Sequence, residues 1–302
     1  MSITLGIVGY GEVGGIFGRG LRTQQGIDAV WVWDLRFVDP EHGAAARLQA
    51  EADGMRVASG MQALCAAADL TISAVTASNT LAVAEEAARH ARPSTRFLDL
   101  NSASPGTKQQ AGAALQAAGA AYVEAGVMTS VPPYGIRVPM LLGGAEAEAL
   151  AGMLCAWGMD ARVVSERLGV ASAIKMSRSI MIKGLEALVI VSYTTARRYG
   201  VEAHVLPTLA ETFPQIDWER QGAYFFSRVM HHGKRRAEEM REAARTVREA
   251  GFEPLMAAAI AARQDAVAVQ ARAGLFDGLD GKSPWQDYAD RLIGDRPRDG
   301  AP

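Results

Sequence analysis

The chain opens with a short apolar segment that leads directly into a glycine turn, and this feature restricts the fold more than any other. Residues 3–8 form the expected strand, and the G-x-G-x-x-G spacing follows in Gly9, Tyr10, Gly11, Glu12, Val13 and Gly14. In a strand–turn–helix unit, the first glycine permits the tight turn, the second admits a pyrophosphate, and the third lets the helix pack on the strand. Free N–H groups at the helix start attract phosphate. These six residues therefore predict a dinucleotide-binding site.

The next expected strand, residues 29–33, ends at an acidic residue, Asp34. An acid about 20 residues beyond the glycine turn accepts a hydrogen bond from the adenosine ribose and repels a 2′-phosphate. Asp34 therefore favours NAD as the cofactor. Arg36 follows shortly afterwards and can accommodate a phosphate, so NADP stays possible.

Apolar strands alternate with amphipathic helices through roughly the first 165 residues. The pattern predicts an α/β fold with a doubly wound, mostly parallel Rossmann sheet and helices on both faces. Strands are expected at 3–8, 29–33, 70–75, 95–100, 121–125, 138–142 and 161–164, with helices at 12–24, 41–53, 60–67, 78–91, 105–118 and 145–157. Ligands of such sheets bind beyond the carboxyl ends of the strands. Val75, Thr76 and Asn101 therefore join the predicted cofactor site.

After Leu168 the alternation stops, and helices are expected at 168–198, 202–212, 221–250 and 254–273. We therefore predict a dinucleotide-binding Rossmann domain over residues 1–165 and an all-helical substrate and dimerisation domain over residues 166–302. The long first helix should end at Tyr199-Gly200, and its apolar length favours a homodimer. The region from Asp277 onward is rich in glycine and proline and is expected to be loosely ordered.

Composition excludes several classes of function. The chain has 302 residues, 49% hydrophobic and 21% charged, with a net charge of −2, so nothing attracts it to nucleic acid or to an anionic membrane. We see no signal peptide and expect no apolar run near the 18 or so residues that a membrane span needs, which favours the cytoplasm. The two cysteines, Cys65 and Cys155, lack metal-ligand spacing, so no metal site is expected.

Lys175 is the leading candidate for chemistry. It lies near the start of the long helix among apolar residues, and burial of a lysine lowers its pKa so that it can exchange a proton near neutral pH. Arg178 and Ser179 follow at i+3 and i+4, where they can bind a carboxylate and a hydroxyl. The local sequence alone fits ordinary solvated or salt-bridged helix charges slightly better.

A histidine-containing basic segment, residues 228–242, is a second candidate. His231, His232 and Lys234 could add polar groups to a cleft, and whether they reach it stays open. Acids interleave with the bases at i+3 and i+4, which is typical of a solvated helix face and disfavours nucleic-acid binding.

Beyond these features, three motifs make the chain resemble the β-hydroxyacid dehydrogenase family, which includes 3-hydroxyisobutyrate dehydrogenases and is related to 6-phosphogluconate dehydrogenase. The family's G-x-x-x-K-x-x-x-N helix resembles Gly169 to Ser179, with Ser179 in the asparagine position. Its D-x-S-T-x-x-P stretch corresponds to residues 99–105. Its D-A-P-V-S-G-G loop partly matches residues 124–130, where Met128, Thr129 and Ser130 replace the serine and both glycines.

The resemblance implies an oxidoreductase that transfers hydride between a nicotinamide cofactor and a small β-hydroxy acid or related alcohol. Lys175 is then the general acid/base. The small carboxylate substrate is held by Ser102, Thr129, Ser130, Arg178 and Ser179. Three alternatives remain: a decarboxylating 6-phosphogluconate-type reaction, which needs a dense basic pocket; imine reduction, whose enzymes usually lack this lysine; and a non-catalytic dinucleotide-binding sensor, which the departures at Met128 and Ser179 keep open.

Overall fold

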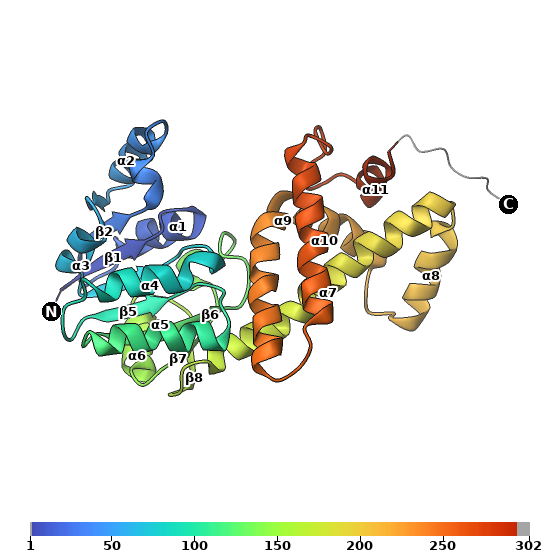
Figure 1. Ribbon diagram of the computed structural model, residues 1–302. Helices are drawn as coiled ribbons and strands as arrows, with labels where there is room; N and C mark the ends of the chain where they lie inside the picture. Colours follow the sequence, from blue (N-terminus) through green and yellow to red (C-terminus); the bar gives the residue numbers. More distant parts are fainter. Residues whose placement is uncertain (1, 295–302) are drawn as a thin grey trace. The chain divides into compact units, whose positions relative to one another are not determined.

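The computed structural model describes residues 2–294 (Figure 1). The chain divides into two compact units, Met1–Ser177 and Arg178–Pro302. The division falls inside the long helix α7 (Val170–Tyr199).

An eight-stranded sheet organises the first unit, in the order β3-β2-β1-β4-β5-β6-β7-β8. The strands are β1 (Ile3–Val8), β2 (Ile27–Trp33), β3 (Arg56–Val57), β4 (Leu70–Ser73), β5 (Arg96–Asp99), β6 (Ala121–Val127), β7 (Met140–Gly143) and β8 (Ala161–Ser165). Neighbouring strands are parallel except β6 and β7. Because β1 lies between β2 and β4, the sheet winds in both directions from β1. The predicted doubly wound Rossmann fold is confirmed.

Helices cover the sheet, and most of them turn an apolar face toward it. They are α1 (Glu12–Leu21), α2 (Gly43–Ala52), α3 (Met61–Ala67), α4 (Thr80–Ala88), α5 (Pro105–Ala117) and α6 (Ala147–Ala156), with short 3₁₀ helices η1 (Leu35–Val38), η2 (Ala77–Asn79) and η3 (Gly135–Arg137). Two buried clusters form the core, one around Leu5 and Phe17 and the other around Leu64 and Phe97. Strand β3 was not predicted, because its two residues are too few to show a period.

The second unit is all-helical, as predicted. It holds the rest of α7 together with α8 (Glu202–Thr212), α9 (Trp218–Glu249), α10 (Leu255–Arg272) and α11 (Trp285–Ile293). Helices α9 and α10 lie side by side (Figure 1). They approach closely at Gly233, where a Cβ would lie 2.9 Å from the carbonyl oxygen of Gln264. Aromatic residues form the core of this unit, among them Tyr193, Trp285 and Tyr288.

The expectation of a loosely ordered region from Asp277 onward is wrong for helix α11. Trp285 and Tyr288 are 1% and 0% exposed and fill the core of the second unit. The indole of Trp285 donates to Glu219, and the hydroxyl of Tyr288 donates to the carbonyl of Asp280. The glycines and prolines before the helix concealed a short amphipathic segment whose aromatic side chains bury enough apolar surface to order it. Residues 295–302 lie outside the described residues.

Helix α7 has the length that we expected but is more apolar. Among the described residues, α7 alone meets the length and composition of a membrane span, with a hydropathy of 1.3 in its most apolar window. The expectation that no apolar run approaches that length therefore fails for α7. Half of the same window is buried inside the protein, and the core helix of a globular protein meets the same criteria.

Candidate functional site

The glycine turn has the geometry that its sequence spacing predicts. Gly9 has φ +88°, a left-handed conformation that favours glycine. A Cβ at Gly14 would lie 1.9 Å from the carbonyl oxygen of Gly9, so only glycine lets α1 start this close to β1. At Gly11, by contrast, a Cβ would meet no atom of the described residues within 4 Å. The turn therefore presents open backbone at the start of α1, which fits a pyrophosphate.

Asp34 lies beside this turn. Its Oδ2 accepts a hydrogen bond from the backbone N–H of Tyr10 at 2.7 Å, and its Oδ1 accepts one from the backbone N–H of Arg36 at 2.8 Å. The Arg36 side chain also forms an ion pair with Asp34 at 3.1 Å and donates to the carbonyl of Tyr10. The acid that the sequence singles out is thus fixed against the turn, with the arginine folded over it.

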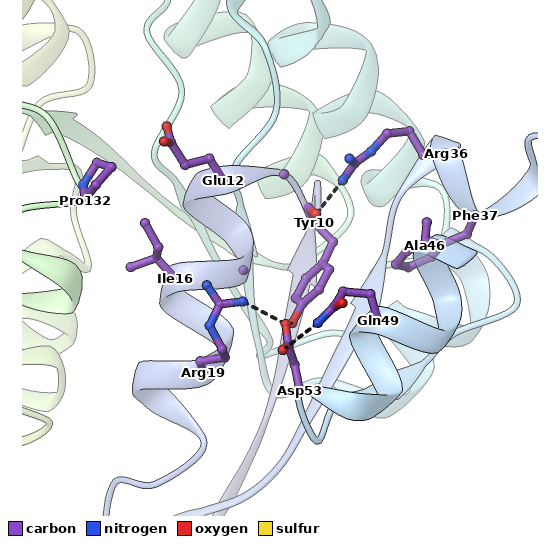
Figure 2. Close-up of a pocket in the computed structure, with 12 residues that line it drawn as sticks. Tyr10, Glu12, Ile16, Arg19, Arg36, Phe37, Ala46, Gln49, Asp53 and Pro132 are labelled. Atoms are coloured by element: carbon purple, nitrogen blue, oxygen red, sulfur yellow. Dashed lines mark hydrogen bonds and ion pairs between the residues drawn. The ribbon is translucent and has the colours of Figure 1, made fainter. Parts of the chain in front are cut away.

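A pocket of about 330 Å³ opens between α1 and α2 next to the turn (Figure 2). On its wall, the hydroxyl of Tyr10 and the guanidinium of Arg19 donate to Oδ2 of Asp53, at 2.8 and 2.7 Å. Burial, and then the hydrogen bond to Asp53, raise the pKa of Tyr10, so this hydroxyl stays protonated. Burial opposes ionisation of Asp53, but hydrogen bonds from Tyr10, Arg19 and Gln49 hold the pKa of its carboxyl below the ordinary value. Sequence reasoning missed Asp53, because Tyr10 and Arg19 lie far away from it in the sequence.

The carboxyl ends of β4 and β5 are tied together by Asn101. Its Oδ1 accepts from the backbone N–H of Val75 at 2.7 Å, and its Nδ2 donates to the hydroxyl of Ser73 at 2.9 Å. Thr76 follows directly and accepts a hydrogen bond from the side chain of Asn79. The three residues predicted from these strand ends therefore lie at one edge of the sheet.

A buried ion pair supports Asn101 from behind. Lys108 and Asp99 are both fully buried, and the lysine Nζ lies 2.9 Å from Oδ1 of Asp99 and 3.0 Å from its carbonyl oxygen. The Asp99 carboxylate also accepts from the hydroxyl of Tyr122 at 2.6 Å and from the N–H of Asn101 at 2.9 Å. Burial and Asp99 raise the pKa of Tyr122. Sequence reasoning missed Lys108, although its i+3 and i+7 spacing to the buried Ala111 and Leu115 puts it on the inner face of α5.

The start of α7 packs against β6. The fully buried Glu124 accepts at Oε1 from the backbone N–H groups of Gly169 and Ala171, at 2.7 and 3.0 Å. A Cβ at Gly126 would lie 3.0 Å from the carbonyl oxygen of Ala171 and 3.4 Å from Cβ of Lys175. Lys175 therefore stands over the carboxyl end of β6, at the same edge of the sheet as the glycine turn and Asn101.

The expected substrate residues divide between the two units. Ser102, Thr129 and Ser130 follow β5 and β6 in the first unit, and all three are at least partly exposed. Arg178 and Ser179 belong to the second unit. Arg178 is exposed, whereas Ser179 is buried and accepts a hydrogen bond from Lys183 at 3.3 Å.

Helix α9 carries the histidine-containing segment within the second unit. His231 and Lys234 are exposed, and a ring nitrogen of His231 lies 2.8 Å from the carbonyl oxygen of Ser227. His232 is half-buried, and burial together with the neighbouring Arg235 lowers its pKa to about 4. His232 is therefore neutral near pH 7. Within the part of the chain that the structure describes, no cluster of three His, Cys, Asp or Glu side chains could hold a metal ion.

Comparison with known families decides the relationship. Residues 4–154 match the model of the NAD binding domain of 6-phosphogluconate dehydrogenase. The chain belongs to the β-hydroxyacid dehydrogenase family. Residues 196–267 match a domain of unknown function, DUF1932. The cofactor expectation, NAD with NADP possible, is confirmed at the level of an NAD-binding domain.

Solved structures agree with this relationship over almost the whole chain. A conserved hypothetical protein from Sinorhizobium meliloti 1021 is 36% identical, with 97% of this chain and 96% of that chain covered and a TM-score of 0.76. The conserved protein MTH1747, described as structurally similar to 3-hydroxyacid dehydrogenases, is 29% identical over 90% and 98%, with a TM-score of 0.67. A Mycobacterium tuberculosis 3-hydroxyisobutyrate dehydrogenase, solved with L-serine, shares the fold at 16% identity over 97% and 100%, with a TM-score of 0.66. The chain is thus an NAD-binding, dehydrogenase-like protein.

Proposed function

We propose that this protein is an NAD-dependent dehydrogenase of small β-hydroxy acids or related alcohols, with Lys175 as its general acid/base. The observation that carries the proposal is the close approach of Lys175 to Gly126. A Cβ at position 126 would lie only 3.4 Å from Cβ of Lys175. This approach supports a lysine side chain that starts at the sheet edge where the glycine turn opens. Ligands of doubly wound sheets bind at that edge.

The proposed chemistry needs few protein groups. The bound nicotinamide supplies the hydride acceptor. Lys175 takes the proton from the substrate hydroxyl in oxidation and returns a proton to the carbonyl oxygen in reduction. The network of Asn101 and Asp99 holds the strand ends fixed, so that the reacting groups are aligned before reaction.

Hydroxyl side chains are proposed to hold the substrate. Ser102, Thr129 and Ser130 follow strands that end at this edge, and Arg178 is the proposed partner of the carboxylate, because its planar fork can bind both oxygens. Ser179 is the remaining proposed contact. The side chains of Met128, Thr129 and Ser130 stand where the family motif has a serine and two glycines, which supports an altered substrate.

NAD is the proposed cofactor because of the charge balance beside the turn. The carboxylate of Asp34 is bonded to the glycine turn, where it would accept a hydrogen bond from the adenosine ribose and repel a 2′-phosphate. Arg36 is already paired with that carboxylate at 3.1 Å. A 2′-phosphate would therefore have to displace the aspartate from its arginine, and NADP is the weaker cofactor in this proposal.

Two other enzyme classes and a non-catalytic role are less well supported. A sugar phosphate needs a strongly basic pocket, whereas only Arg178 and the basic residues 231–236 of α9 are candidates to supply one. Imine reductases usually lack the lysine that stands here at position 175. A redox sensor would bind NAD without turnover, and the substrate screen below separates it from an enzyme.

We further propose a cytoplasmic homodimer. Both cysteines, Cys65 and Cys155, are free thiols, which suits a reducing compartment. Large apolar side chains on α7 are exposed in the second unit, including Met181 at 73% and Leu188 at 57%, and a second copy of the chain would cover them. Sedimentation of the purified protein checks the dimer.

The decisive experiment is a cofactor-reduction screen across three- and four-carbon hydroxy acids with NAD and with NADP. We expect turnover with NAD, and loss of turnover in Lys175→Ala while NAD binding is retained. Binding of NAD without turnover of any hydroxy acid would favour the sensor.

A further inference from the structure

We infer that Glu124 is a positioning residue for Lys175, acting by holding the first turn of α7 against strand β6. The inference rests on the proposed role of Lys175. Glu124 itself takes no direct part in the proposed reaction.

Glu124 is a buried hydrogen-bond acceptor for backbone N–H groups. It is 0% exposed, and its Oε1 accepts from Gly169 at 2.7 Å and from Ala171 at 3.0 Å. Space for that oxygen exists because the neighbouring strand has a glycine opposite, Gly143, where a Cβ would lie only 2.7 Å from Oε1. The carboxylate thus reaches across to the residues that begin α7.

The start of a helix needs such a partner, because its first N–H groups have no acceptor within the helix. Gly169 has φ +99°, and its carbonyl accepts the N–H of Ala173 at 2.9 Å, so the helical turns begin there. A carboxylate at this end also interacts favourably with the helix dipole. Glu124 therefore fixes both the position of the first turn and its rotation about the helix axis.

Lys175 is tied directly to that turn. It follows Ala171 by four positions, so both residues lie on one face of α7. On the strand, Gly126 and Glu124 point to the same face of the sheet, because side chains alternate along a strand. The carboxylate that holds Ala171 and the glycine that receives Lys175 are thus neighbours on one strand. A shift of the first turn moves the lysine by the same amount.

The second carboxylate oxygen argues for a positioning role over a role in stability. Oε2 of Glu124 is buried and has no hydrogen-bond partner among residues 2–294. Leaving a buried charged oxygen unsatisfied costs free energy, and a site selected for stability alone would avoid it. The free-energy cost of the unsatisfied Oε2 is explained if Oε1 sets the position of Lys175.

The test compares Glu124→Ala with Glu124→Gln. Glutamine keeps one carbonyl oxygen for the two N–H groups, whereas alanine keeps none. The matched control is Glu186→Gln, which alters an equally buried carboxylate whose partners, Arg236 and Gln264, belong to the second unit. Three readouts are measured: hydrogen exchange of residues 169–176, labelling of the Lys175 amine by acetic anhydride, and kcat and KM on the hydroxy acid that the screen identifies.

We expect Glu124→Ala to speed hydrogen exchange across residues 169–176 and to change the labelling rate of Lys175 at least about threefold. It should also lower kcat by about 100-fold, because a misplacement of a catalytic group by about 1 Å has that effect. KM for NAD should stay unchanged. Glutamine should restore all three readouts to within about threefold of the native chain. The control should change none of them.

Equal kcat in Glu124→Ala and the native chain, while Lys175→Ala is inactive, would overturn the inference and leave the proposed function intact. Full turnover in Lys175→Ala would remove the proposed function itself, and the inference with it. Should no hydroxy acid be turned over, the first two readouts decide: unchanged exchange and labelling in Glu124→Ala overturn the inference.

Discussion

Replacing Lys108 by methionine should destabilise the first unit by about 3 kcal/mol, the lower end of the cost of breaking a buried ion pair. The native lysine makes two contacts with Asp99, at 2.9 and 3.0 Å, and both residues are fully buried. In the variant the Asp99 carboxylate keeps its hydrogen bonds from Tyr122 and Asn101, which is why we expect the lower end. The carbonyl of Asp99 loses its partner as well.

The measurement is a urea transition followed by a probe in the first unit, with the slope m compared between variants. For a unit of this size, about 3 kcal/mol corresponds to a fall of about 6–12 °C in Tm. Lys282→Met is the control, because that side chain is exposed and its loss should change stability by less than about 0.5 kcal/mol. Adding Asp99→Asn to Lys108→Met should recover part of the loss, since the unpaired buried charge is removed.

A loss below about 1 kcal/mol in Lys108→Met would refute this reasoning, because it would mean that the pair contributes no more than an exposed one. A full loss without recovery in the double variant would show that lost packing, rather than an unpaired charge, causes the effect.

Three further predictions concern binding and pH. Gly11→Ala should fold normally but weaken NAD binding at least about tenfold, because the phosphates are expected to approach through the open space at the helix start. Gly14→Ala should weaken NAD binding and also lower Tm, so NAD titration together with thermal melts distinguishes the two variants. Asp34→Ser should raise the kcat/KM ratio of NADP to NAD by at least about tenfold, whereas an unchanged ratio would exclude Asp34 as the determinant. The depressed pKa of His232, about 4 against 6.5, means that the unfolded chain binds more protons between these values; stability should therefore fall as pH drops through this window, and less steeply in His232→Asn, with parallel curves contradicting the assignment.

The sequence predicted the sheet and the glycine turn because both depend on local rules. A strand followed by Gly9, Gly11 and Gly14 leaves few conformations open, and the alternation of apolar strands with helices sets the winding of the sheet. The acid at the end of β2 was found for the same reason, since its distance from the turn along the chain is nearly constant in such folds.

The supporting residues could not be found this way, because their partners are distant in sequence. Glu124 binds Gly169, 45 residues further on, and Asp53 binds Tyr10, 43 residues earlier. An acid within a strand or at the end of a helix carries no local sign of such a partner. Helix α11 was missed because its order comes from burial of Trp285 and Tyr288, which depends on the surrounding helices.

Three carboxylates bind backbone N–H groups near the sheet edge where the cofactor is proposed to bind. Asp34, Asp99 and Glu124 each accept a backbone N–H from a loop or helix start that follows a strand, at 2.7, 2.9 and 2.7 Å. A carboxylate bonded to backbone N–H groups fixes a loop without adding a side chain to its open side. These bonds hold loop and helix starts against the sheet, which suits a site that must align two reacting carbons. Substituting any of the three should disturb the arrangement of this edge before it unfolds the sheet, because the strands themselves are held by their own ladder of hydrogen bonds.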